Sequence, residues 1–201
     1  MSKPIIAIDI DDVLADYAAG FVAFSNQRWG TNLTIDDYDE HWGNVWKVDL
    51  EEIQRRAATI HDERLVRTLT HRSEAVPVLE HLSQSFDLVI VTSRRIQNKD
   101  DTLAWLRLHY PMISLETVTF SGFFDTIREG SIHQTKGDII SSLGAQYMID
   151  DQLKHCLSAA KYGVDALLFG DYAWNQMASL PSGVTRVHDW AKVKEYFDAV
   201  S

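Results

Sequence analysis

The sequence predicts an α/β protein: a three-layer sandwich around a Rossmann-like parallel sheet of about five strands, with a small helical cap. Two patterns lead to this prediction. Over residues 73–201, short apolar runs alternate with amphipathic helical stretches, as in a doubly wound sheet. The first of the apolar runs, at residues 5–8, is rich in β-branched residues, and such a run is typical of a strand that helices cover on both faces.

The size and composition limit the classes of function. A chain of 201 residues with 45% hydrophobic residues suits one main domain with a modest insertion. The formal charge of −10 argues against binding of duplex nucleic acid, which relies on a basic surface. Cys156 is the single cysteine, so we expect no internal disulfide and a cytoplasmic location. No stretch approaches a membrane span, so no membrane partner is expected, and the sequence leaves the oligomeric state open.

The first predicted strand, residues 5–8, ends at three crowded carboxylates, Asp9, Asp11 and Asp12. Asp at a strand end is often only a turn former or a helix cap. Three carboxylates so close together repel one another, however, and a folded protein tolerates them with hydrogen-bond donors, water or a cation nearby. We therefore expect a functional site here, with Asp9 and Asp11 facing a bound ion.

The next segment, residues 18–72, differs in composition from the rest of the chain. Three of the six tryptophans, Trp29, Trp42 and Trp46, lie here among acidic residues, and helical patches are predicted at residues 35–38 and 50–59. We interpret 18–72 as the cap and residues 1–17 with 73–201 as the core domain. The three tryptophans are more readily explained as the hydrophobic core of the cap than as ligand contacts.

The remaining elements follow in alternation. Strands are predicted at residues 86–91, 116–120, 146–149 and 166–169, with a further edge strand at 184–187. Helices are predicted at residues 15–27, 73–85, 100–110, 135–143 and 154–162, and a final helix begins after Asp189 as its cap. Phe123 and Phe124 are interpreted as core residues.

Polar residues stand at the ends of three predicted strands. The first strand ends in Asp9 and Asp11, the second in Thr92, and the fourth in Asp150 and Asp151. Parallel sheets bind ligands beyond the carboxyl ends of their strands. Hard oxygen ligands without a cysteine or histidine cluster indicate Mg²⁺ rather than zinc.

The stretch Asp9–Tyr17 resembles the first motif of the haloacid dehalogenase-like phosphohydrolases, Asp-x-Asp-x-Val/Thr after a hydrophobic strand. It is most similar to the deoxyribonucleotidase branch of that superfamily. This chain departs from the branch at Asp12, where the branch has Gly, and at Tyr17, where it usually has Phe. The later motifs of the superfamily match in order at Thr92, Lys136 and Asp150–Asp151, so the resemblance covers nearly the whole chain outside the cap.

The resemblance implies a role for each motif residue. Asp9 is the expected nucleophile, which forms an aspartyl-phosphate, and Asp11 the general acid and base. Mg²⁺ is expected between Asp9, Asp11 and one carboxylate of the Asp150–Asp151 pair; we favour Asp151.

Phosphate binding is expected from the second and third motifs. Thr92, Ser93 and Lys136 would contact the transferring phosphoryl group, and Arg94 is a candidate for the same role. Tyr17 is the expected substrate-binding aromatic, since the matching position in the branch packs against a pyrimidine base. The alternative is that Tyr17 packs under the cap with Phe21, four residues along the helix.

These residues predict a Mg²⁺-dependent phosphomonoester hydrolase with a small phosphorylated substrate, which the resemblance suggests is a nucleoside or deoxynucleoside 5′-monophosphate. Two alternatives remain at this point. One is a phosphatase of a sugar phosphate or another small metabolite, with the same machinery and a different cap pocket. The other is a non-catalytic binding protein of the same fold, which would be expected to lack a motif.

Overall fold

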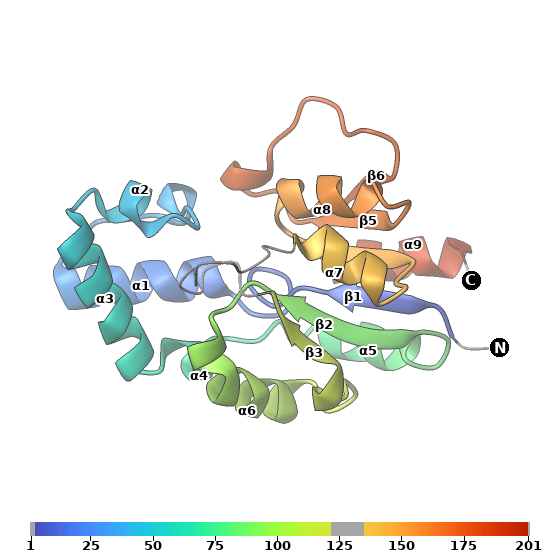
Figure 1. Ribbon diagram of the computed structural model, residues 1–201, viewed down its shortest axis with the longest axis horizontal. Helices are drawn as coiled ribbons and strands as arrows, with labels where there is room; N and C mark the ends of the chain where they lie inside the picture. The colour runs from blue at the N-terminus through green and yellow to red at the C-terminus, as the bar shows by residue number, and fades with distance from the viewer. Residues whose placement is uncertain (1–2, 122–134, 201) are drawn as a thin grey trace.

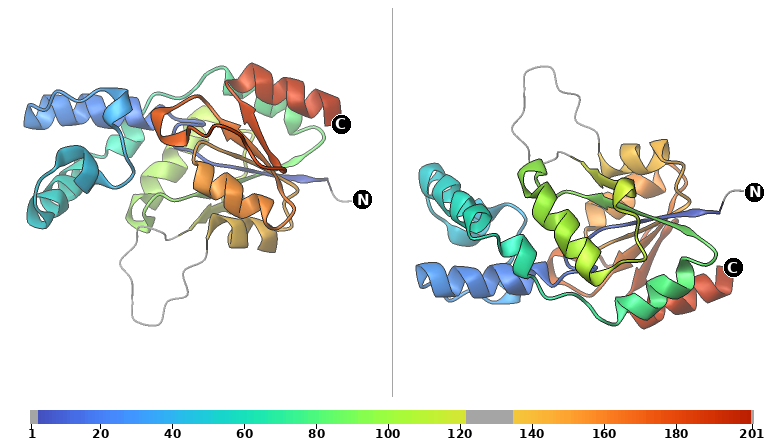
Figure 2. Two further views of the ribbon diagram at one scale, coloured as in Figure 1. Left: turned by 90° about the horizontal axis from the view of Figure 1, so that it is seen from above. Right: turned by 90° about the horizontal axis from the view of Figure 1, so that it is seen from below.

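The computed structural model describes residues 3–121 and 135–200, and Phe123 and Phe124 lie outside them. The α/β prediction is confirmed, with helices on both faces of a parallel sheet (Figures 1 and 2). The strands are β1 (Ile5–Ile8), β2 (Asp87–Thr92), β3 (Val118–Phe120), β4 (Tyr147–Asp150), β5 (Asp165–Phe169) and β6 (Val184–Val187). The sheet has six strands where about five were predicted; the sixth is the further edge strand predicted at 184–187, which pairs with β5.

The helices along the described chain are α1 (Tyr17–Trp29), α2 (Trp42–Trp46), α3 (Leu50–Asp62), α4 (Leu65–Thr68), α5 (Ala75–Leu82), α6 (Lys99–His109), α7 (Lys136–Ser142), α8 (Leu153–Ala160) and α9 (Trp190–Val200). Helices α7 and α9 each begin after a capping residue, and the cap of α9, Asp189, was predicted from the sequence. Asp189 caps α9 by accepting a hydrogen bond from the Lys192 amide at 2.8 Å. Thr135 and Asp138 form a reciprocal capping box at the start of α7, a motif that satisfies two free amides at a helix N-terminus.

Two hydrophobic cores lie on the two faces of the sheet. Alternate residues of one strand point to opposite faces, so Leu88 and Ile90 of β2 belong to one core and Val89 and Val91 to the other. Helices α5 and α9 cover the first core, and α7 and α8 cover the second (Figure 2). Both faces of the sheet are therefore buried, which explains why its strands are continuous apolar runs.

The strand order is β3-β2-β1-β4-β5-β6. From β1 the chain builds outward through β2 and β3, and then returns to add β4, β5 and β6 on the other side. The direction changes between β1 and β4, and such a switch point is where open α/β sheets bind ligands. The amide of Asp9 donates to the carbonyl of Ile149 at 2.9 Å, so the ends of these two strands lie side by side.

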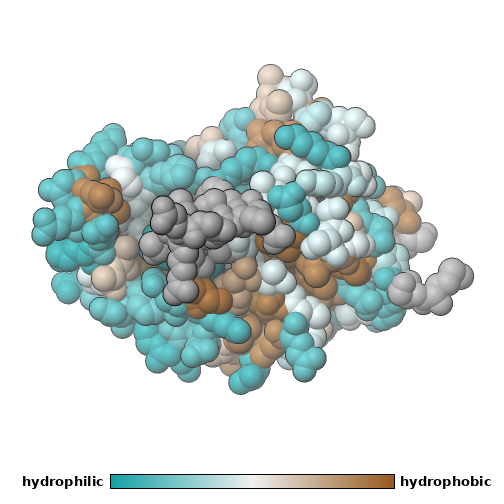
Figure 3. All heavy atoms as spheres, in the orientation of Figure 1, coloured by the Kyte–Doolittle hydropathy of each residue, from teal (hydrophilic) through white to brown (hydrophobic). Residues whose placement is uncertain are grey.

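The segment 18–72, predicted as a cap, contains most of α1 and all of α2, α3 and α4. The first three lie away from the sheet, whereas α4 lies beside α6 (Figure 1). The interior of the segment is aromatic: the Phe21 ring stacks on Trp46 with centroids 5.2 Å apart, and Trp29 meets Trp46 edge-on at 5.0 Å. Hydrophilic side chains predominate on its visible outer surface (Figure 3). The division into core and cap remains a prediction. In the described ranges, no helix has the length and apolar character needed to cross a bilayer.

Candidate active site

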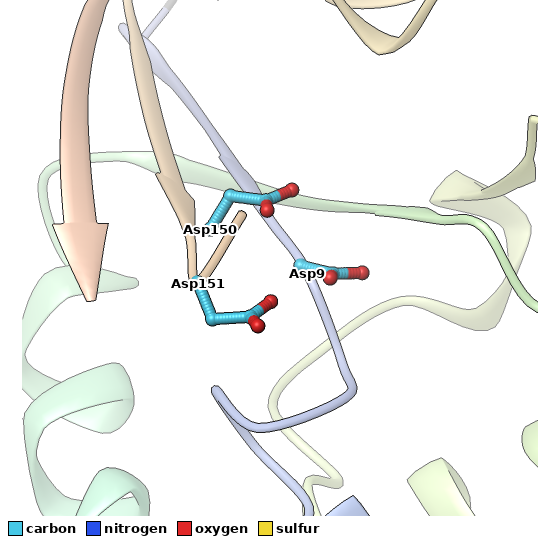
Figure 4. Close-up of side chains that lie close together, drawn as sticks. All are labelled: Asp9, Asp150 and Asp151. Carbon is cyan, nitrogen blue, oxygen red and sulfur yellow. The ribbon is translucent and has the colours of Figure 1, made fainter. Parts of the chain in front are cut away.

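Three aspartates meet at the switch point of the sheet (Figure 4). Asp9 follows β1, Asp150 ends β4 and Asp151 comes next. One carboxylate oxygen from each lies within 4.8 Å of the others, and the three residues are at most 6% exposed. This is the one group in the described ranges, 3–121 and 135–200, in which three or more acidic, histidine or cysteine side chains could hold a metal ion.

Lys136, the first residue of α7, inserts its ammonium between two of these carboxylates. Its Nζ lies 2.8 Å from Asp150 Oδ2 and 2.9 Å from Asp9 Oδ1, and the residue is 2% exposed. Burial alone would lower the pKa of Lys136, but Asp150 and Asp9 outweigh it and hold the pKa above its usual value. The lysine is therefore a permanent positive charge inside the site.

One lysine does not balance three buried carboxylates. Burial is the main cause that raises the pKa of Asp9 to about 7, with Lys136 opposing the rise. Burial and the neighbouring Asp150 raise the pKa of Asp151 well above its usual value. Within the described residues, the buried Asp9 Oδ1 has the Lys136 ammonium beside it and no further hydrogen-bond donor. Surplus negative charge on hard oxygen atoms matches the ligand preference of Mg²⁺, so the residues present fit this ion.

The Asp11 carboxylate is not part of this group of three. It is held by Arg94, whose Nη2 donates to Asp11 Oδ1 at 2.6 Å and whose Nε donates to the same oxygen at 3.0 Å. The Arg94 side chain is only 2% exposed, and its Nη1 donates to Thr102 at 3.3 Å. The structure thus places the predicted acid and base beside a buried guanidinium, a pairing that the sequence did not predict.

Thr92 and Ser93 lie at the end of β2, beside the acidic loop. Thr92 is fully buried and its Oγ1 accepts a hydrogen bond from the Arg94 amide at 3.1 Å. Ser93 lines the cavity described below. The two hydroxyls therefore differ in accessibility, and Ser93 is the one that a ligand in the cavity can reach directly.

Asp12 has a local structural role. Its φ of +58° is left-handed, a conformation in which Gly is most at ease and Asp is tolerated. Its carboxylate accepts the Ala18 amide at 3.1 Å in the first turn of α1. Burial raises the pKa of Asp12 to about 8. The resembled branch thus has Gly at a turn position that requires positive φ. In this chain the Asp12 side chain at that position also caps the first helix.

A cavity of about 320 Å³ opens above the carboxylates. Its lining includes Tyr17, Tyr38, Trp42, Asn98, Arg95 and Gln152, besides the acidic residues and Lys136. Tyr17 both lines this cavity and packs against Phe21, with ring centroids 6.2 Å apart. Trp42 lines it as well, while Trp46 is buried in the aromatic core.

The predicted cap contacts the core across this cavity. His61 Nδ1 lies 2.8 Å from the side-chain oxygen of Asn98, and Glu40 forms an ion pair with Lys154. The guanidinium of Arg95 lies 5.9 Å from the Trp42 ring centroid. These contacts combine polar and aromatic groups around the space above the aspartates.

Sequence reasoning missed a group of residues in the loop after β5. Tyr172, Trp174 and Asn175 reach back to the acidic loop and to Asp151. No motif marks them. The one available signal was that these residues follow the carboxyl end of a predicted strand. The carboxyl ends of parallel strands lie at one edge of the sheet, where Asp9 also lies.

Comparison with known proteins identifies the family. Residues 3–200 match the sequence model of the family described as 5′ nucleotidase, deoxy (pyrimidine), cytosolic type C protein, NT5C. The chain belongs to this family. NT5C membership and the likeness to haloacid dehalogenase-like hydrolases together make it a phosphatase of that superfamily, as predicted.

Relatives of this NT5C protein match over their whole length. A Staphylococcus epidermidis protein provisionally assigned as a 5′(3′)-deoxyribonucleotidase is 25% identical, covering 100% of this chain and 99% of that protein. A haloacid dehalogenase-like family hydrolase from Streptococcus pneumoniae has a TM-score of 0.67 at 16% identity, covering 97% of this chain and 98% of that one. A D,D-heptose 1,7-bisphosphate phosphatase from B. bronchiseptica, solved with magnesium and phosphate, has a TM-score of 0.60 at 14% identity. The match covers 98% of this chain and 99% of that one.

Proposed function

We propose that this NT5C protein hydrolyses nucleoside or deoxynucleoside 5′-monophosphates through an aspartyl-phosphate on Asp9, with Mg²⁺ as cofactor. The observation that carries the proposal is the buried set of Asp9, Asp150 and Asp151 with Lys136 between them, directly below a cavity lined by aromatic rings. Phosphate esters repel anionic nucleophiles, so a site that attacks one needs positive charge beside its nucleophile. Lys136 supplies that charge from the protein.

Asp9 and Asp151, with Asp150 beside them, would hold Mg²⁺, which would neutralise phosphate charge when bound. A carboxylate oxygen of Asp9 attacks phosphorus, and the bond from phosphorus to the ester oxygen breaks. Asp11 gives its proton to the departing alcohol, then takes a proton from the water that attacks the aspartyl-phosphate. Inorganic phosphate leaves and Asp9 is regenerated as a carboxylate.

The residues around the phosphorus position have supporting roles. Ser93 lies in the cavity wall and can donate a hydrogen bond to a phosphoryl oxygen, while the buried Thr92 orders the same turn through the Arg94 amide. Arg94 fixes the Asp11 carboxylate in the present structure. Its assignment as a direct phosphate ligand remains a prediction.

The substrate assignment rests on the cavity and on the family. The cavity volume of about 320 Å³ lies at the lower end of the range for small-molecule pockets. Tyr17, Tyr38 and Trp42 in its wall offer aromatic rings on which a base could stack. The family description and the Staphylococcus epidermidis relative both name nucleotidases. A sugar phosphate is the second candidate, because polar lining residues such as Asn98 and Gln152 could bind hydroxyl groups.

The test is a phosphatase screen over nucleoside monophosphates and sugar phosphates, with Mg²⁺ and with EDTA. We expect turnover of nucleotides with Mg²⁺, its loss in EDTA, and its return when Mg²⁺ is restored. Asp9→Asn should abolish turnover, because the amide cannot attack phosphorus. Full activity in EDTA would remove the metal assignment, and near-native turnover by Asp9→Asn would remove the covalent mechanism. If every sugar phosphate were hydrolysed faster than every nucleotide, the proposed substrate would be a sugar phosphate and not a nucleotide.

A further inference from the structure

The Asp151 carboxylate is held by a tryptophan from another part of the chain. Trp174, in the loop between β5 and β6, donates its indole Nε1–H to Asp151 Oδ2 at 2.6 Å. A hydrogen bond to a charged acceptor is shorter and stronger than one between neutral groups. This contact joins the loop to a residue of the candidate metal site.

A second donor reaches the same oxygen. Gln152 Nε2 donates to Asp151 Oδ2 at 2.9 Å, while the Gln152 amide donates to Asp150 Oδ1 at 2.8 Å. Two donors on one oxygen restrict rotation of the carboxylate about its last bond. They also leave Oδ1 as the oxygen that these two hydrogen bonds do not use.

The loop that carries Trp174 is itself fixed to the strand ends. The side-chain amide of Asn175, a fully buried residue, donates to the carbonyls of Asp151 and Phe169, each at 3.0 Å. Tyr172 donates its hydroxyl to the Asp12 carbonyl at 2.9 Å and stacks on Trp174 with centroids 4.5 Å apart and planes 4° apart. The indole is therefore held in one position before any ligand arrives.

Trp174 also contacts the predicted cap. The Tyr38 ring lies edge-on to Trp174, with centroids 5.2 Å apart, and Tyr38 also lines the cavity. Trp174 thus contacts both a residue of the cavity wall and a candidate metal ligand.

From these contacts we infer that Trp174 and Gln152 are positioning residues, which orient Asp151 for a divalent cation by occupying its Oδ2. The inference rests on the proposed function, since it requires the metal site. Partners that orient a metal ligand through its second polar atom commonly change metal affinity by 10-fold to 100-fold when they are removed. Trp174 acts through Asp151 and need not touch the substrate.

The test measures divalent-ion binding directly, without turnover. Mn²⁺ favours the same oxygen ligands as Mg²⁺, and its unbound fraction can be read by electron paramagnetic resonance. Titrations compare the wild-type protein with Trp174→Phe, which keeps a ring against Tyr172 and removes the N–H. We expect Trp174→Phe to raise the Kd for Mn²⁺ by about 10-fold or more, and competition with Mg²⁺ should show a shift of the same size.

Trp46→Phe is the matched control. It also removes an indole hydrogen bond, from Nε1 to Ser25 Oγ at 3.2 Å, but Trp46 is not among the residues that line the cavity. Its Kd for Mn²⁺ should equal that of the wild type. Gln152→Met is a second variant, in case Trp174→Phe does not fold. It removes the other donor to Asp151 Oδ2 and should raise the Kd as well.

The outcomes separate this inference from the proposed function. Unchanged affinity in Gln152→Met and in a folded Trp174→Phe, beside a normal wild-type site, would overturn this inference and leave the proposed function standing. A wild-type protein without a Mn²⁺ site, or Mn²⁺ binding that survives Asp9→Asn unchanged, would overturn both. A raised Kd in Gln152→Met with a wild-type Kd in Trp46→Phe supports the inference even where Trp174→Phe does not fold.

Discussion

At the residue scale, the candidate site is an arrangement of buried charges that do not cancel. Lys136 contacts Asp9 and Asp150, but Asp151 has only neutral hydrogen-bond donors, Trp174 and Gln152, within the described chain. A buried carboxylate without an opposite charge favours its protonated form. The site should therefore take up either protons or a cation, and the two should compete.

This competition predicts a pH dependence of stability. The pKa values of Asp9 and Asp12 are raised to about 7 and about 8, so the native state binds protons that the unfolded state has already released. Their contribution to the free energy of unfolding is full below the unfolded pKa near 4. It decreases as pH rises above that value and is completely lost once pH has passed the folded pKa values of about 7 and about 8. Without metal, we expect the free energy of unfolding to fall between pH 6.5 and 8.5, by up to about 1.4 kcal/mol per pH unit for each group.

Urea unfolding in EDTA across that window measures the slope. Asp9→Asn, which cannot titrate, should have a shallower slope than the wild type, and added Mg²⁺ should stabilise the wild type most at the high-pH end. The window avoids His155, because burial lowers the pKa of that residue to about 3. The contribution of His155 to the free energy of unfolding is full above its unfolded pKa near 6.5 and is lost only as pH falls below that value. A flat wild-type profile would contradict the raised pKa values.

Tyr17 carries the prediction about substrate choice. Stacking of a base on an aromatic ring is worth about 1–3 kcal/mol, and roughly 1.4 kcal/mol corresponds to tenfold. Tyr17→Ala should therefore lower kcat/KM for a nucleotide by about 5-fold to 150-fold, and should change that for p-nitrophenyl phosphate much less. Tyr17→Phe is the control, since it keeps the ring. Equal losses on both substrates, with a lowered Tm, would show that the contact with Phe21 is the whole role of Tyr17.

At the scale of elements, the acidic loop is organised by its own backbone. The amides of Leu14 and Ala15 donate to the Ile10 carbonyl at 2.8 and 2.9 Å, and the amide of Asp12 donates to the Ala15 carbonyl at 2.7 Å. The chain therefore curls tightly between β1 and α1. This curl lets Asp9 remain at the sheet while Asp12 turns to cap the helix.

The curl predicts unequal effects for two substitutions of Asp12. Asn keeps an oxygen for the Ala18 amide and tolerates the positive φ, whereas Ala does neither. Asp12→Ala should lower the free energy of unfolding by about 2 kcal/mol, the sum of a lost cap and a strained turn, and Asp12→Asn by less than half of that. Urea titrations at pH 7 measure both. Equal losses would mean that neither the cap oxygen nor the tolerance of Asn for positive φ explains the stability of this turn.

The elements were more predictable than the contacts between them. The strand ending at Thr92 and the strand ending at Asp150 were predicted because an apolar run stops abruptly at polar residues. The burial of Lys136 was not predictable from its own surroundings, since a lysine at a helix start is usually exposed. Trp174 was missed because its partner Asp151 is brought near only by the pairing of β4 with β5 and the loop that follows. The local sequence pattern identifies candidate site residues, whereas the contacts between distant segments determine which side chains lie beside one another.

At the scale of the whole molecule, the candidate site joins segments that are far apart in the sequence. Asp9 directly follows β1, Lys136 begins α7 and Asp151 directly follows β4. A cation bound between these segments stabilises the native state, and contacts that form late in folding mainly slow unfolding.

Saturating Mg²⁺ should therefore lower the unfolding rate and leave the refolding rate within about 2-fold, since the set of carboxylates is completed only after long-range pairing. Stopped-flow measurements of tryptophan fluorescence in urea, with Mg²⁺ and with EDTA, give both rates. Asp9→Asn serves as the control, and its unfolding rate should respond less to Mg²⁺. Faster wild-type refolding in Mg²⁺ would show that the carboxylates already converge in the transition state.

The strand order also has a consequence for biosynthesis. β1 leaves the ribosome before the other five strands of the sheet, and it occupies the middle of the finished sheet between β2 and β4. Until β4 has been synthesised, a nascent chain carries β1 with one open edge, and an apolar strand with an open edge can pair with other chains. A product of interrupted translation that ends before β4 lacks both Asp150 and Asp151. Such fragments should be inert as phosphatases, and they should depend on chaperones or proteases for their removal.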